Sequence, residues 1–364
     1  MPTSTPRPED DSAPYGQIVD PWAPQTSRRA QRQQARRESP ASRNAASAPR
    51  VDPGAGAPLA YELLRLSNVS GASGGFGRLL RSMFGSDTSA GDLAAAAHEA
   101  QAAVTTGRRI AVFSTRGGAG TTTATAALAR VFAAVRQDTT AALDLSLGHG
   151  SLGLRLGADP AAGRSFAQLV PDTTGGRLPT AAELHAMLVP ITDNLLATAS
   201  APAAAGPPPA GSLVRETCAN VSRYFPLTLL DCPAGINQST TASALADAHA
   251  VLWVVPATMS GVEDALAQLS GPYLRQLVAA GRVVVLVTQL DRKAPVTAAA
   301  QAQRLHALGY EAHALDYDAH LAAGARLSLN LLGAERRMAL AQLAGRLVTN
   351  ANAAQTSLKA GRRP

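Results

Sequence analysis

One glycine-rich run has the residue types of an anion-binding loop. Residues 114–123 read STRGGAGTTT and stand between an apolar stretch, 110–113, and a stretch with helical character, 121–135. Glycines let backbone amides approach an anion closely, and the start of a helix adds partial positive charge. This is the layout of a phosphate-binding loop. Many glycine-rich turns are only structural, so the prediction needs support from elsewhere in the chain.

Two carboxylates give that support. Asp231 ends the apolar stretch 227–231 and is followed by Cys-Pro-Ala-Gly, and Asp144 ends another apolar stretch. The carboxyl ends of parallel strands face the crevice in which ligands bind. Asp231 is therefore expected to hold a magnesium ion through water. Loop and carboxylates together predict a site for a phosphate and a metal ion.

The elements that must position these groups alternate along the chain. Short apolar runs with helical stretches between them indicate an α/β fold: a doubly wound, mostly parallel sheet with helices on both faces. The predicted strands are 110–113, 140–145, 195–198, 227–231, 251–255 and 283–288. The predicted helices are 92–104, 121–135, 181–188, 213–224, 262–277, 296–308 and 335–348. We expect one domain over residues 90–350, with a proline-rich surface loop at 202–209.

Composition excludes several classes of protein. Of 364 residues, 46% are hydrophobic, which is too apolar for a wholly disordered chain. There is no apolar run long enough for a spanning helix and no secretory pattern at the start. Two cysteines make no disulfide framework, so a reducing cytoplasm is the expected location. Cys232 is expected to be a small buried residue rather than a nucleophile.

The ends of the chain differ from the middle. The net charge is +7, and many arginines lie in residues 1–58, a Pro/Ala/Arg-rich stretch without apolar periodicity that we expect to be a disordered arm. The arm is either a solubilising tail or a tether for an anionic surface. Residues 351–364 are expected to be a flexible tail. The helix before that tail either docks on the domain or, less in keeping with the polar tail, binds membrane.

A short amphipathic helix is predicted inside the linker 59–89. Its apolar residues fall at helical spacing, and glycines flank it. Because so short a helix is marginal in water, it must lie on its own domain, in a partner's groove or at a membrane interface. The helix spans 76–84, and its apolar residues are Phe76, Leu79, Leu80, Met83 and Phe84.

The motifs resemble those of a known family. The run RGGAGTTT at 116–123 resembles the deviant phosphate-binding loop of the MinD/ParA superfamily of P-loop ATPases, K-G-G-x-G-K-[ST]-[ST], and is most similar to its CpaE/TadZ-like and septum-site-determining-like branch. DCPAG at 231–235 resembles the family's switch D-x-P-A-G, and 314–321 resembles its late tyrosine-aspartate loop. The resemblance spans about 108–348. It implies a switch protein that dimerises face to face around two ATP molecules and positions septa, chromosomes, pili or secretion machines. Actinobacterial relatives with long basic arms accompany type VII secretion or septum functions.

The resemblance also assigns roles to residues. Thr122 would coordinate magnesium together with Asp231, and Gly235 would sense the terminal phosphate through its amide. Gln289, where relatives read the adenine with asparagine, would bind the base or only cap its own loop. The phosphate-cradling positions are Gly117, Gly118, Ala119 and Gly120, followed by Thr121, Thr122 and Thr123.

Three positions depart from the family pattern. Arg116 stands where the signature lysine reaches the partner's phosphates, and arginine keeps that charge. Thr121 replaces the loop lysine, and Ser146 replaces the second aspartate of the D-x-D pattern that begins at Asp144, which leaves Arg116 and Asp144 as the candidate catalytic groups. Since phosphoryl transfer depends on electrostatic stabilisation and a positioned water, we expect ATP binding with weak or absent hydrolysis.

Three functions are consistent with this sequence. The first is an ATP-dependent, homodimeric switch that binds a protein of a septal, chromosome-partitioning or secretion machine and contacts the inner face of the membrane through 76–84. The second is a nucleotide-independent scaffold that acts through its N-terminal arm. The third is a nonspecific DNA-binding partition protein, although the domain's arginines are dispersed and lack interleaved aromatics.

Overall fold

The computed structural model describes residues 90–147, 150–159, 162–176, 178–200 and 209–360. The predicted arm 1–58, the linker 59–89 with its helix 76–84, and residues 202–208 of the proline-rich loop lie outside these residues. In the described part of the chain, no helix combines the length and the apolar character needed to cross a bilayer.

An eight-stranded sheet forms the centre of the fold, in the order β3-β4-β2-β5-β1-β6-β7-β8. All neighbouring strands pair in parallel except β3, which is antiparallel to β4 at one edge. β1 lies between β5 and β6, so the loop after β1 opens beside the end of β5. The strands are β1 Arg108–Phe113, β2 Thr140–Asp144, β3 Val189–Thr192, β4 Leu195–Ala197, β5 Leu227–Asp231, β6 Ala250–Pro256, β7 Val283–Thr288 and β8 Ala312–Leu315.

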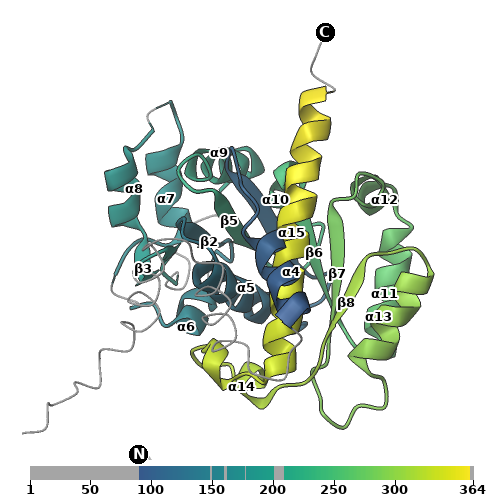
Figure 1. Ribbon diagram of the computed structural model, residues 1–364. Coiled ribbons are helices and arrows are strands. Elements are labelled where there is room, and N and C mark those ends of the chain that lie inside the picture. Colours follow the sequence, from purple (N-terminus) through teal and green to yellow (C-terminus); the bar gives the residue numbers. More distant parts are fainter. Residues whose placement is uncertain (1–89, 148–149, 160–161, 177, 201–208, 361–364) are drawn as a thin grey trace, which may run out of the picture. The chain divides into compact units, whose positions relative to one another are not determined.

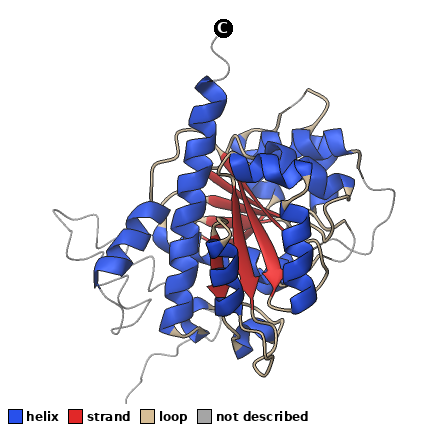
Figure 2. Ribbon diagram, turned by 90° about the vertical axis from the view of Figure 1, so that its right-hand side faces the viewer, coloured by secondary structure: helices blue, strands red, loops and turns tan. Residues whose placement is uncertain are grey.

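Helices cover both faces of the sheet (Figures 1 and 2). One apolar cluster buries the sheet against α4, α5, α6, α14 and α15, and a second buries it against α7 to α13. The helices are α4 Ala90–Ala100, α5 Thr121–Val135, α6 Leu152–Leu156, α7 Phe166–Thr173, α8 Ala181–Met187, α9 Gly211–Val221, α10 Ser239–Asp247, α11 Met259–Leu269, α12 Pro272–Ala279, α13 Ala298–Ala307, α14 Ala319–Ala322 and α15 Ala334–Ala360, with a 3-10 turn at Leu329–Leu331.

Alternation along the central strands explains this double cover. In β1, Ile110 and Val112 belong to one apolar cluster, whereas Ala111 and Phe113 belong to the other. Successive side chains of a strand point to opposite faces, and all four are fully buried. Trp253 in β6 is also fully buried. The continuous apolar runs in the sequence are therefore strands with no solvent-facing side.

The sequence prediction was wrong about several boundaries. The single helix expected at 262–277 is two helices, α11 and α12, because Gly271-Pro272 starts a new helix with proline at its first position. The tail expected from 351 begins as helix: α15 continues to Ala360, and Ala351 and Ala354 are buried. The helices α6, α7, α10 and α14 and the strands β3 and β8 were not predicted.

A glycine sets the spacing between β1 and the end of α9. A Cβ built on Gly107 would lie 1.7 Å from the carbonyl oxygen of Ser222, and both groups belong to the backbone. Gly107→Ala is therefore expected to lower the free energy of unfolding by about 2–3 kcal/mol, measured by urea denaturation. Gly333→Ala is the matched control, since only the tip of Arg336 lies near its Cβ. Equal stability of the two variants would contradict this packing.

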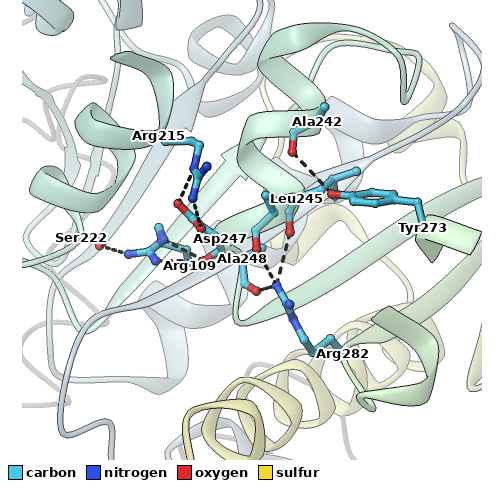
Figure 3. A network of polar contacts seen from close by, with 10 residues as sticks. Arg109, Arg215, Ser222, Ala242, Leu245, Asp247, Ala248, Tyr273 and Arg282 are labelled. Atoms are coloured by element: carbon cyan, nitrogen blue, oxygen red, sulfur yellow. Dashed lines mark hydrogen bonds and ion pairs between the residues drawn. The ribbon is translucent and has the colours of Figure 1, made fainter. Parts of the chain in front are cut away.

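Polar side chains hold the C-terminal end of α10 (Figure 3). Arg109 donates to the carbonyl oxygen of Asp247 from Nε and Nη2 at 3.1 and 2.9 Å, and from Nη1 to Ser222 Oγ at 2.9 Å. Arg282 donates to the carbonyls of Leu245 and Ala248. The last carbonyls of a helix have no partner within the helix, and these two arginines supply one. They fix the far end of the helix that follows the 231–235 loop.

This arrangement predicts unequal effects of two arginine substitutions. Arg109→Met removes the donors to the α10 terminus and is expected to cost about 1–3 kcal/mol of unfolding free energy. Arg215→Met is the control, because Arg215 pairs with the Asp247 carboxylate in an ion pair whose arginine side chain is 52% exposed, and exposed pairs contribute little. Chemical denaturation of both variants checks the difference. A larger loss for Arg215→Met would show that the carboxylate pair, not the carbonyl contacts, holds the helix end.

Candidate functional site

The loop between β1 and α5 has the geometry of an anion cradle. Gly118 and Gly120 take positive φ angles of 79° and 94°, which other residues rarely adopt. Gly120 precedes α5 without a side-chain cap, and the first turn of α5 holds no acidic residue. In the described part of the chain, the amides of residues 117–123 donate to no protein acceptor. The loop therefore presents unpaired amides and a helix start, a combination that favours an anion.

A cavity of about 330 Å³ opens beside this loop. Its floor is formed by the loop and α5, and its walls come from segments after β7 and β8 and from the α6 and α14 regions. Leu290, Leu315 and Leu321 form an apolar part of its lining, and the loop and the first turn of α5 contribute polar groups. The lining residues are Gly118, Gly120, Thr122, Thr123, Ser151, Arg155, Thr288, Gln289, Leu290, Leu315, Asp316, Asp318, Leu321, Ala322 and Gly324.

Asp231 lies beneath the first turn of α5. Its Oδ1 accepts a hydrogen bond of 3.0 Å from the hydroxyl of Thr125. Its Oδ2 is buried and has no hydrogen-bond partner among the described residues. The hydroxyl of Thr122 lies close enough to this carboxylate to favour its charged form, and Thr122 also lines the cavity. The structure thus brings together the two residues predicted to hold magnesium.

Asp144 and Asp231 stand side by side on β2 and β5, as paired residues of the sheet. Burial and the neighbouring charge of Asp144 raise the pKa of Asp231 to about 8, against the opposing effect of Thr122 and Thr125. Burial likewise raises the pKa of Asp144. Two buried carboxylates this close disfavour a second negative charge. Without a cation, the pair keeps a proton near neutral pH.

Asp144 holds its own loop. Its two carboxylate oxygens accept hydrogen bonds from the amides of Ser146 at 3.0 Å and Leu152 at 3.1 Å. A Cβ on Gly150 would lie 2.1 Å from Oδ2, so the loop passes tightly over the carboxylate. Neither oxygen is left unpaired. The geometry gives Asp144 a loop-fixing role, and the catalytic role suggested for it stays a prediction.

Arg116 is partly exposed and contacts a carboxylate of its own chain. Its Nε is 3.5 Å from Oδ2 of Asp264 on α11, and the hydroxyl of Thr115 donates to the same oxygen at 2.8 Å. The arginine side chain is 47% exposed. In this conformation its charge is partly neutralised by Asp264, a residue that the sequence analysis did not connect with the loop. Reaching a partner's phosphate would require release from that carboxylate.

Two other predicted binding groups are engaged within the chain. The amide of Gly235 donates to the carbonyl of Ser114 at 2.8 Å, which joins the 231–235 loop to the start of the phosphate loop. Gln289 lines the cavity, but its Nε2 donates to the carbonyls of Asp291 and Val296 and its Oε1 accepts from Ala298. These contacts favour the loop-capping interpretation of Gln289.

The remaining predicted residues divide into two groups. Gly118, Gly120, Thr122 and Thr123 line the cavity as expected, whereas Gly117, Ala119 and Thr121 belong to the loop or helix without lining it. Ala119 is buried, and its carbonyl accepts a hydrogen bond from Thr288. Cys232 is buried, as predicted. Arg155, Thr125 and Asp264 were not predicted, because none of them stands at a position to which the motifs assign a role.

The residues present fit a magnesium nucleotide. The unpaired amides of 117–123 suit phosphate oxygens, and the orphaned Oδ2 of Asp231 beside Thr122 suits a hard cation that prefers oxygen ligands. The leucines of the cavity wall suit a base. When bound, magnesium would neutralise phosphate charge, and it would also relieve the repulsion between Asp231 and Asp144.

Fold and site together define the class: the chain has the P-loop NTPase fold of the MinD/ParA kind. It is similar to a chain of the MinC:MinD cell division protein complex of Aquifex aeolicus, with a TM-score of 0.50 and 18% identity over 65% of this chain and 95% of that one. Two further similar structures are a ParA family ATPase from Chlorobium tepidum (TM-score 0.48, 16% identity, 67% and 98% covered) and the septum site-determining protein MinD with Mg-ADP from Pyrococcus horikoshii (0.46, 18%, 64% and 94%). The fold assignment rests on the first. No protein-family model and no curated protein matches the sequence.

Proposed function

We propose that this chain is a switch protein that binds magnesium ATP and hydrolyses it slowly or not at all. The observation that carries the proposal is the convergence of Thr122 and the orphaned Oδ2 of Asp231 beneath a helix start with unpaired amides. Such a site supplies ligands for phosphate and for a divalent cation at adjacent positions. The cavity of about 330 Å³ beside it leaves room for the rest of a nucleotide.

Slow hydrolysis follows from what the site lacks. Thr121 brings no charge to the first turn of α5, and Ser146 is held at Asp144 by its amide. Phosphoryl transfer needs positive charge on the transferred group and an oriented water. Neither Thr121 nor Ser146 provides a charged group for these tasks.

The proposed cellular role is regulation of a larger machine through a protein partner. We propose a homodimer that regulates a septal, chromosome-partitioning or type VII-like secretion machine through a protein partner, in the manner of CpaE/TadZ-like or septum-site-determining members. The name of one similar structure, a MinC:MinD cell division complex, supports the kind of partner. We propose a cytoplasmic location with peripheral contact at the inner face of the membrane through 76–84, which lies outside the described residues.

One observation favours the nucleotide-independent scaffold as the alternative. Arg116 and Gly235, two groups predicted to reach the phosphates, are engaged by Asp264 and Ser114 within the chain. A scaffold would keep these contacts permanently. Light scattering with and without magnesium ATP separates the two functions, since only the switch dimerises on nucleotide. Salt-dependent retention on DNA would instead support the partition protein.

Isothermal titration with magnesium ATP tests the proposal directly. We expect saturable binding by the wild-type chain and none by Gly118→Val, because valine does not adopt the positive φ of Gly118. Gly281→Val is the matched control: Gly281 also has positive φ, 64°, but lies outside the cavity lining. Absence of heat at millimolar nucleotide with the wild-type chain would overturn the proposal.

A further inference from the structure

Arg155 is a buried cation at the wall of the nucleotide cavity. It extends from α6, the short helix that follows the Asp144 loop, and only 3% of the residue is exposed. Among the described residues that line the cavity, it is the one with a positive charge. It lies in the run that follows Asp144, where no role was predicted for it.

Its hydrogen bonds join three parts of the site. Nη2 donates to the hydroxyl of Thr123 at 2.7 Å and to the carbonyl of Leu321 at 2.7 Å, and Nη1 donates to the carbonyl of Ala325 at 2.9 Å. Its backbone carbonyl accepts from the amide of Leu327. The guanidinium is therefore fixed between the first turn of α5 and the segment around α14.

Arg155 has no counter-charge among the residues that the structure describes. In the described ranges no carboxylate forms an ion pair with it, and its acceptors are a hydroxyl and two carbonyls. Asp318, which also lines the cavity, pairs with Arg336 at 3.6 Å and accepts from the amides of His320 and Leu321. A buried charge is costly without a counter-charge. Guanidinium groups with free donors match phosphate oxygens.

We propose that Arg155 binds a phosphate group of the nucleotide and supplies, from α6, the positive charge that Thr121 does not bring to the loop. This inference rests on the proposed nucleotide binding and deepens it. Arg155 contacts Thr123, one residue beyond Thr122, so its guanidinium lies beside the first turn of α5. It also links phosphate binding to the α14 segment through Leu321 and Ala325.

The test compares three ligands that differ in their number of phosphate groups. ATP, ADP and adenosine are titrated into the wild-type chain, Arg155→Gln and Arg155→Lys. We expect Arg155→Gln to lower the affinity for ATP and ADP by about tenfold or more, as for loss of a charge-assisted hydrogen bond. The affinity for adenosine should fall by less than about twofold. Arg155→Lys, which keeps the charge, should recover much of the ATP affinity. If Arg155 had only a structural role, its substitution would change the affinities for all three ligands by one common factor.

The control is Arg130→Gln. Arg130 lies on α5, donates to the carbonyl of Leu156, and does not line the cavity. Burial, with the charge of Arg326 adding to it, lowers the pKa of Arg130 to about 10, so both arginines are desolvated cations beside α6. The substitution Arg130→Gln should leave the ratio of ATP to adenosine affinity unchanged. If Arg155→Gln does not fold, the same ratio measured with Arg155→Lys and Arg155→Met decides.

Two results separate the possible failures. A wild-type chain that binds none of the three ligands overturns both the proposed function and the role of Arg155. A wild-type chain that binds ATP, with an unchanged ratio of ATP to adenosine affinity in every Arg155 variant, overturns the role of Arg155 alone.

Discussion

Thr121→Lys is expected to tighten magnesium ATP binding by more than about tenfold, the size of a new charge-assisted contact. Thr121 opens α5 directly after Gly120, at a helix start with unpaired amides and no side-chain cap. A lysine there brings an ammonium group to the phosphates that the amides hold. Titration calorimetry measures the affinity of both chains.

Adding Ser146→Asp to Thr121→Lys is expected to raise ATP turnover by at least about 100-fold over the wild-type chain, in line with the usual contribution of one positioned catalytic group. The new carboxylate would stand two residues after Asp144, at the position of the second aspartate in the family's D-x-D pattern, and is expected to orient water.

Thr121→Gln is the matched control for the affinity of Thr121→Lys, since glutamine has length but no charge. Equal affinities for the lysine and glutamine variants would contradict an electrostatic deficit at position 121. Phosphate release under steady-state conditions gives the turnover.

Asp231→Asn is expected to stabilise the protein at pH 8 by at least about 2 kcal/mol when a chelator removes divalent ions. Burial and the charge of Asp144 raise the pKa of Asp231 to about 8, whereas in the unfolded chain it returns to about 4. Between these values the folded state holds a proton that the unfolded state lacks. The free energy of unfolding therefore falls as pH rises from about 4 to about 8.

The amide variant has no proton to lose and should not show this contribution. Urea denaturation at pH 4, 6 and 8 follows the difference between the two chains, which should grow with pH from near zero. Asp264→Asn serves as the control, because Asp264 is 26% exposed and has the cation Arg116 beside it. A wild-type chain that is more stable than Asp231→Asn at pH 8 would show that the ionised Asp231 carboxylate does not destabilise the folded state.

The same substitution separates stability from function. Magnesium should stabilise the wild-type chain and not Asp231→Asn, because the charged carboxylate is the cation's ligand. A residue that destabilises the free protein and is needed for its ligand is common at functional sites. The buried acid pair thus has a physical reason to be present.

Much of the fold could be predicted because it depends on local pattern. The continuous apolar runs of the central strands and the helical periodicity of α5 and α15 are both visible in the chain. The edge strands β3 and β8 were missed because they are short and only partly buried. The helix α7 carries Pro171 in its interior, which argues against a helix in the sequence, yet packing and a capping box at Ser165 stabilise it.

The chemistry of the loop was determined by the sequence alone. Glycines at 117, 118 and 120, threonines at the start of α5 and a carboxylate at a strand end are all visible in the sequence, and together they predicted an anion site. The absence of charge at Thr121 is equally local. The predicted pairing of Thr122 with Asp231 appears in the structure because β5, which ends at Asp231, lies beside β1, which leads into the loop.

The tertiary structure alone decided which charges surround that loop. Arg155 and Asp264 lie 32 and 149 residues along the chain from the loop residues they contact, and no periodicity connects such positions. The Asp144–Asp231 repulsion likewise arises from the neighbouring places of β2 and β5 in the sheet. Electrostatic energy depends on distance and burial in space, and these quantities exist only once the chain has folded.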